Sequence, residues 1–110
     1  MGTRLTGMLP ALVIAAVLEI GGDAAIRNGL VRASWAWVVA GAAALVAYGL
    51  TVNVYRRVDF GPLMGTYIAV FFVVSLAMSV AVFGERPSRA LLLGGALIVA
   101  GALVIQRSVR

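Results

Sequence analysis

The 110 residues of the chain are 63% hydrophobic and only 12% charged. Soluble domains carry about one-quarter charged residues, so this composition excludes an ordinary water-soluble globular fold. Cysteine and histidine are both absent, which excludes disulfides, zinc sites, thiol nucleophiles and imidazole bases.

The formal net charge of +5 comes from nine arginines. These arginines are scattered at the ends of apolar runs rather than gathered on one face, so we do not expect a nucleic-acid partner. The sequence also contains no metal-ligand cluster, no phosphate-binding loop and no nucleophile paired with a base. We therefore expect a protein that is not an enzyme and that holds no cofactor or metal.

Four apolar stretches are long enough to cross a bilayer, whose core of about 30 Å needs about 20 apolar residues per helix. Short connections that contain glycine, proline, asparagine or charged residues separate the stretches. The four stretches cover residues 5–26, 33–54, 61–83 and 89–105. The sequence therefore predicts an all-α membrane protein in which residues 1–110 form a single four-helix transmembrane domain.

The first span carries Glu19, Asp23 and Arg27 at intervals of four residues, which places them on one helical face. An acid at mid-membrane costs about 2.5 to 3.5 kcal/mol, whereas each Leu, Ile or Val returns about 0.3 to 0.6 kcal/mol. For Asp23 and Arg27 we favour an ion pair within the helix near the interface. Glu19 lies deeper, and we favour a proton or cation site there over burial against a neighbouring hydroxyl.

Two further features lie in the later spans. Phe71 follows Tyr67 by one helical turn in the third span, and the two rings form an aromatic face that either stacks on a cation or simply packs. In the fourth span, the small residues Gly94, Gly95 and Gly101 allow close backbone approach. This helix is a candidate dimerisation helix, although the same residues would also serve packing within one subunit.

With four spans, both termini lie on one side of the membrane, and the arginines can be counted by side. The terminal side has five arginines and the other side has four. Because the difference is so small, the positive-inside rule selects no orientation. Either other features decide the topology, or copies insert both ways up and pair antiparallel. The terminal-side arginines are Arg4, Arg56, Arg57, Arg107 and Arg110; the others are Arg27, Arg32, Arg86 and Arg89.

Nearly the whole chain resembles the small multidrug resistance family of the drug/metabolite transporter superfamily. Subunits of that family have a glutamate within helix one, a basic residue eight positions later and then a glycine, which Glu19, Arg27 and Gly29 match. The segment 83–86 (Phe-Gly-Glu-Arg) resembles the family's loop between helices three and four. The segment 94–101 resembles its helix-four dimer motif.

The resemblance implies an antiparallel, dual-topology homodimer in the bacterial inner (plasma) membrane. Its two glutamates would form one site that is exposed to each side in turn and shared competitively by protons and substrate. Tyr67 is the best positional match to the aromatic residues with which helix three of the family lines this site. Asp23 is a departure, because the family usually has a neutral residue there.

We therefore expect a proton-coupled exporter of small organic cations, with a second copy of the chain, protons, the cation and the bilayer as its partners. Glu19 would bind either a proton or the cation, and Tyr67 would orient Glu19. Phe71 and Phe72 would contact apolar parts of the substrate. The alternatives are a flippase for a lipid or lipid-linked metabolite and a non-transporting membrane subunit. The candidate binding residues are Glu19, Asp23, Asn53, Tyr67, Phe71 and Phe72, with Arg27 at the entrance.

Overall fold

The computed structural model describes residues 5–55 and 57–107, so Arg4, Arg56 and Arg110 of the arginine count lie outside the described residues. The helices are α1 (Leu5–Arg32), α2 (Trp35–Val52), α3 (Phe60–Ala81) and α4 (Arg89–Gln106), with a short 3-10 turn, η1 (Asn53–Tyr55), after α2. All four α-helices are long and apolar enough to cross a membrane. The predicted all-α fold with four spanning helices is confirmed.

Helix α1 extends beyond the predicted end of the first span. The prediction ended this span at residue 26 and placed a turn over residues 27–29. The predicted turn is wrong, because the helix continues to Arg32. A span ends where apolar residues end, but a helix continues into the headgroup region as long as its backbone bonds are satisfied. The actual stop is Ala33, whose φ of 53° is left-handed. The Ser34 amide donates back to the Gly29 carbonyl at 2.9 Å, the closure of a Schellman motif.

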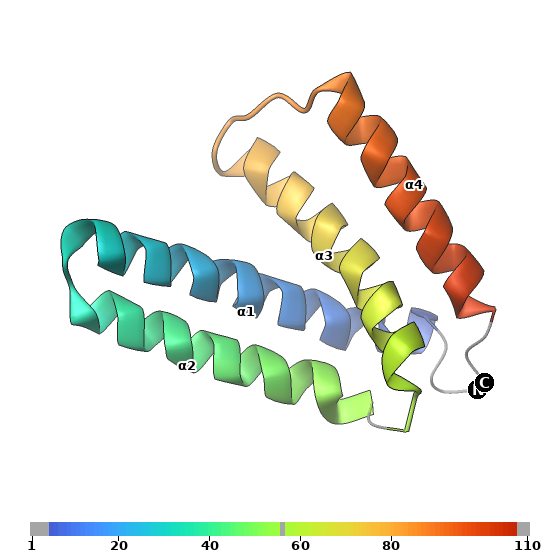
Figure 1. Ribbon diagram of the computed structural model, residues 1–110, viewed down its shortest axis with the longest axis horizontal. Coiled ribbons are helices and arrows are strands. Elements are labelled where there is room, and N and C mark those ends of the chain that lie inside the picture. The colour runs from blue at the N-terminus through green and yellow to red at the C-terminus, as the bar shows by residue number, and fades with distance from the viewer. Residues whose placement is uncertain (1–4, 56, 108–110) are drawn as a thin grey trace.

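Helices α1 and α2 form an antiparallel hairpin and make the most extensive helix pairing of the subunit (Figure 1). Their backbones approach most closely at Gly22 and Gly41, both of which are buried. A Cβ atom added to Gly41 would lie 2.6 Å from the Gly22 carbonyl oxygen, and one added to Gly22 would lie 2.9 Å from the Gly41 carbonyl oxygen. Only glycine fits this approach, since any side chain would collide with backbone.

Helix α3 crosses α1 near the N-terminal ends of these two helices, which diverge toward the connections 33–34 and 82–88 (Figure 1). The buried core lies at this crossing, where Met8 and Leu12 of α1 meet Leu63 of α3. Each of these three side chains is at most 1% exposed. The subunit is therefore closed at this crossing and splayed at the opposite end.

Helix α4 packs on α3 through small residues and one polar bond. The ring of Phe72 lies against Gly95, and Ile105 lies against Gly65. Near the terminal end, the Gln106 side-chain amide donates a 2.7 Å hydrogen bond to the hydroxyl of Thr66, which is 1% exposed. A bond between two polar side chains inside an apolar interface ties α4 to α3 at this level.

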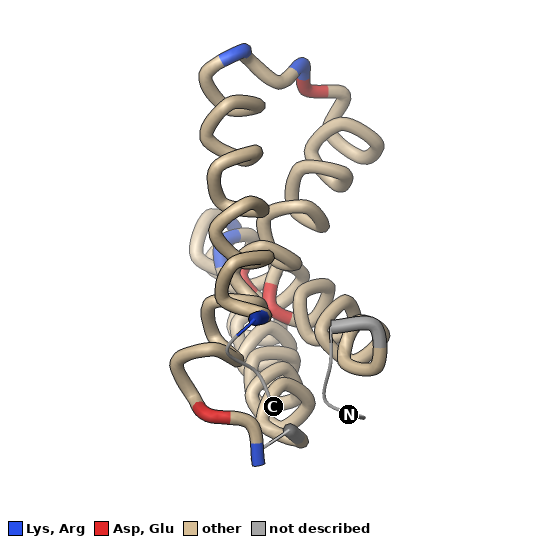
Figure 2. The backbone as a smooth tube through the Cα atoms, turned by 90° about the vertical axis from the view of Figure 1, so that its right-hand side faces the viewer, with Lys and Arg blue, Asp and Glu red and all other residues tan. Residues whose placement is uncertain are grey.

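The subunit is thin, with extents of 46 × 35 × 18 Å. Only 11% to 28% of the residues in the most apolar window of each helix are buried, and large side chains such as Val39 and Leu97 are exposed. Charged residues gather at the connections and helix ends, apart from those within α1 (Figure 2). Lipid or another protein surface must therefore cover most of the apolar faces.

Candidate functional site

Glu19 and Tyr67 meet where α1 and α3 begin to diverge. The Tyr67 hydroxyl donates a 2.7 Å hydrogen bond to Glu19 Oε1. Tyr67 is 4% exposed, while Glu19 is half-buried. The structure thus brings together the two residues that the sequence placed at the centre of the site. One carboxylate oxygen is fixed by the phenol, and the side chain remains partly accessible.

Aromatic rings from two helices extend this pair. Tyr48 of α2 lies with its ring centroid 5.5 Å from that of Tyr67, and the ring centroid of Phe71 lies 6.1 Å from that of Tyr67. Both distances are within the range of favourable aromatic contacts. Tyr48 was missed by sequence analysis, because a single tyrosine in an apolar helix does not reveal which neighbour it faces. The available signal for Tyr48 was its hydroxyl, a polar group within an apolar span.

Two other predicted site residues lie elsewhere. Phe72 packs against Gly95 at the boundary of α3 and α4, not against the Tyr67 ring. Asn53 follows the end of α2, is exposed, and donates its side-chain amide to the Gly49 carbonyl at 2.9 Å. Within the described subunit, neither residue is brought to Glu19.

The three glycines of α4 divide into two groups. Gly95 is buried beneath Phe72, so it serves packing within this subunit. Apart from its chain neighbours and the adjacent backbone of α4 itself, a Cβ atom added to Gly94 or Gly101 would meet no atom of the described residues within 4 Å. These two glycines therefore lie on an open face of α4.

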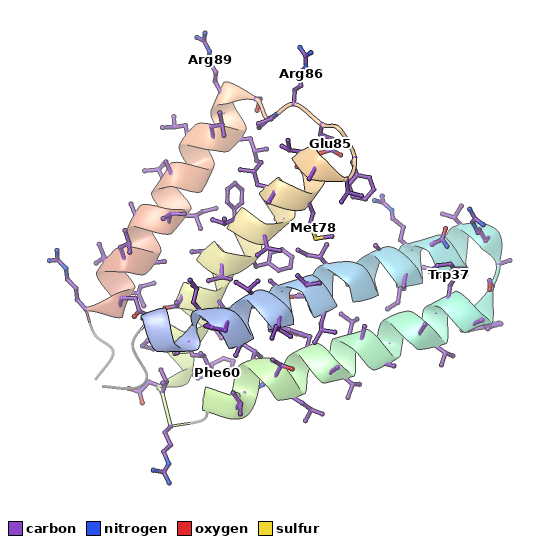
Figure 3. All side chains as sticks on the ribbon, turned by 180° about the vertical axis from the view of Figure 1, so that it is seen from behind. Trp37, Phe60, Met78, Glu85, Arg86 and Arg89 are labelled. Atoms are coloured by element: carbon purple, nitrogen blue, oxygen red, sulfur yellow. The ribbon has the colours of Figure 1, made fainter. Side chains whose placement is uncertain are left out.

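Asp23 and Arg27 line a cavity of about 520 Å³. Asn28 and Val31 of α1 and Phe83, just beyond the end of α3, also line it. Figure 3 shows the segment between α3 and α4, which carries Glu85 and Arg86, raised away from the hairpin end marked by Trp37. Among the described residues, Asp23 and Arg27 form no ion pair within 4.0 Å. The ion pair that the sequence favoured is therefore absent from this conformation, and both charges border the cavity.

The arrangement gives the site a defined chemistry. A carboxylate held by one phenol can accept a proton or bind a cation, but it cannot satisfy both at once. Electron-rich ring faces beside a carboxylate favour organic cations. An intramembrane acid that is neither ion-paired nor fully buried is a functional-site candidate by its cost alone.

Comparisons with known proteins place the chain among bacterial membrane proteins. A family model described as "Uncharacterised BCR, YnfA/UPF0060 family" matches residues 5–110. A UPF0060 membrane protein of Mycolicibacterium gilvum is 36% identical over 99 residues, covering 89% of this chain and 92% of the relative. A UPF0060 membrane protein of Nocardia farcinica is 39% identical over 99 residues, covering 88% of each. No solved structure matches.

Proposed function

Because the chain belongs to the YnfA/UPF0060 family of the drug/metabolite transporter superfamily, we propose that it is a proton-coupled exporter of small organic cations. The observation that carries this proposal is the Glu19–Tyr67 hydrogen bond of 2.7 Å at membrane depth. The bond orients an acid that the bilayer would otherwise disfavour. An intramembrane acid is costly, and binding a proton or a cation is the role that accounts for its presence.

Competition for one carboxylate provides the coupling. A cation that binds Glu19 displaces its proton, and a proton that returns from the other side displaces the cation. The half-buried rings of Tyr48 and Phe71 contact the apolar and cationic parts of the substrate, while the buried Tyr67 orients Glu19. Export then needs only that the site be exposed to one side at a time.

We further propose that the working unit is an antiparallel homodimer in the inner membrane, related in mechanism to the small multidrug resistance family. Only 11% to 28% of the residues in the most apolar window of each helix are buried within one subunit, and α1 and α3 diverge from a single crossing. One such subunit does not enclose a transport path. The open α4 face around Gly94 and Gly101 is where the second copy would dock.

The decisive experiment compares Glu19→Gln with Glu85→Gln in proteoliposomes. Glu85 is exposed in the segment between α3 and α4, so its substitution controls for loss of a negative charge. We expect Glu19→Gln to abolish uptake of guanidinium compounds, quaternary amines and polyamines driven by a pH gradient, and Glu85→Gln to retain it. Retained uptake by a dimeric Glu19→Gln variant would contradict the proposal.

A second measurement tests the competition directly. Detergent-solubilised protein in weak buffer should release protons when a transported cation is added, since the cation displaces the Glu19 proton. The release should vanish in Glu19→Gln. Cation binding without proton release in the unsubstituted protein would separate binding from coupling and count against an exchange mechanism.

A further inference from the structure

The cavity beside Asp23 and Arg27 lies along the last third of α1. Helix α1 has 28 residues and is therefore about 42 Å long at about 1.5 Å per residue, longer than a hydrocarbon core of about 30 Å. Its last turns thus reach the headgroup region. Trp35, which is 77% exposed at the start of α2, also lies at this end, where tryptophan prefers the interface.

The cavity presents one charge of each sign. Asp23 and Arg27 are one helical turn apart, about 6 Å along the axis, and they form no ion pair within 4.0 Å among the described residues. Both side chains are exposed and line the same cavity. Each therefore keeps its charge available for a ligand, although a bond to the other would be the local alternative.

The pairing of charges selects against simple ions. A plain cation that approached Asp23 would meet the like charge of Arg27, and a plain anion at Arg27 would meet that of Asp23. A molecule that carries both charges satisfies both residues and keeps the cavity neutral. Arginine is the side chain whose planar fork suits a phosphate, and Arg27 directly follows the apolar stretch 5–26, where the hydrocarbon gives way to headgroups.

We propose that this cavity binds a zwitterion in which an ammonium group and a phosphate are joined by two carbons, with the phosphate on Arg27 and the ammonium on Asp23. Val31 and Phe83, both exposed and both lining the cavity, cover the carbon link. The volume of about 520 Å³ is within the range of about 300 to 1,000 Å³ for small-molecule sites. The inference rests on the proposed function in one respect: the ammonium passes from Asp23 to Glu19, one turn deeper.

The same chemistry occurs in phosphatidylethanolamine headgroups and in water-soluble phosphoethanolamine esters. Calorimetric titration of the detergent-solubilised full chain distinguishes them with two probes. Dihexanoyl phosphatidylethanolamine represents the lipid, and glycerophosphoethanolamine represents the soluble ester. Binding of the first alone assigns a lipid headgroup, and equal binding of both assigns the soluble class. Ethanolamine and glycerol phosphate supply each half of the zwitterion separately.

We expect the zwitterion to bind at least about tenfold tighter than either half, in keeping with one charge-assisted contact at each end. Arg27→Gln should weaken zwitterion binding about tenfold and leave ethanolamine binding equal or tighter. Arg32→Gln is the matched control, because Arg32 is exposed on the same helix and outside the cavity lining. Asp23→Asn should weaken every ammonium probe.

Two results would overturn the inference: ethanolamine binding as tightly as the zwitterion, or Arg27→Gln behaving like Arg32→Gln. All four side chains to be tested are exposed or half-buried, and size-exclusion profiles verify that each variant is folded. Glu19→Gln separates this inference from the proposed function. If that variant loses transport but still binds the zwitterion with Arg27 dependence, both stand. If it transports, the proposed function falls together with the transfer of the ammonium to Glu19, and zwitterion binding at Asp23 and Arg27 stands or falls with its Arg27 dependence.

Discussion

The Tyr67 phenol and the Glu19 carboxylate join α3 to α1 across 48 positions of sequence through a 2.7 Å hydrogen bond. The bond lies next to the closed core, to which Tyr67 itself belongs. Its phenol proton is the donor, so the bond fixes the orientation of the Glu19 carboxylate. This single bond therefore sets how the carboxylate is presented to a ligand.

Tyr67→Phe removes the hydroxyl and keeps the ring. Without the donor, the Glu19 carboxylate is no longer held in one orientation, so a bound cation loses a fixed partner. We expect the affinity for a quaternary amine to fall about 2- to 10-fold, in keeping with the free energy of one hydrogen bond. Calorimetric titration of the detergent-solubilised protein at a fixed pH would measure this. An unchanged affinity would show that the hydroxyl does not act on the acid.

Tyr48→Leu tests the aromatic contact that sequence analysis missed. Loss of a ring 5.5 Å from Tyr67 should weaken binding of a quaternary aromatic cation about 3- to 30-fold, the range of a cation–π contact. Phe72→Leu is the control, because Phe72 packs on Gly95. It should leave affinity unchanged and lower stability only. Equal losses of affinity in both variants would argue against a site built around Tyr48.

Gly41→Ala tests the close approach of α1 and α2. The added methyl group would lie 2.6 Å from a backbone oxygen, and backbone does not yield easily, so we expect a loss of about 1 to 3 kcal/mol in the free energy of unfolding. Gly49→Ala on the same helix meets no atom of the described residues within 4 Å. It should be neutral or gain up to about 1 kcal/mol from helix propensity. Denaturation followed by circular dichroism in detergent compares the two.

Ala33→Gly should stabilise the hairpin. Ala33 has a left-handed φ of 53°. This conformation costs a residue with a Cβ atom about 1 to 2 kcal/mol, whereas glycine adopts it without that steric cost. We expect a higher melting temperature for this variant. Ala42→Gly in the exposed middle of α2 should instead lower it, since glycine weakens a helix interior by about 1 kcal/mol. A lower melting temperature for both would show that the turn is not strained.

The four spans could be predicted because the length of an apolar stretch depends on the bilayer alone. The end of α1 could not, because the left-handed stop is an alanine rather than the expected glycine. The same limit applies to the Asp23–Arg27 pair. Spacing shows that two charges can meet on a helix, but a cavity beside them offers each another partner.

The centre of the site was predicted in part for a geometric reason. Tyr67 and Phe71 are four residues apart and share a helical face, whereas Phe72 is rotated by about 100° from Phe71. Phe71 and Phe72 cannot both face Glu19 from one helix. The sequence alone could therefore have shown that Phe72 points elsewhere. The position of Tyr48 depends on how closely α1 and α2 pack. That distance is set by Gly22 and Gly41, whose pairing no local pattern reveals.

The crossing of α1 and α3 provides a point about which the two helices could rotate. The buried contact of Leu12 with Leu63 and their neighbours lies at this point, and the helix ends diverge from it (Figure 1). Helix α3 extends about 27 Å from Leu63 to Ala81, so a rotation of about 10° would move its end by about 5 Å. Packed side chains at the crossing would hardly shift, and the opening at the helix ends would change by the width of a small molecule.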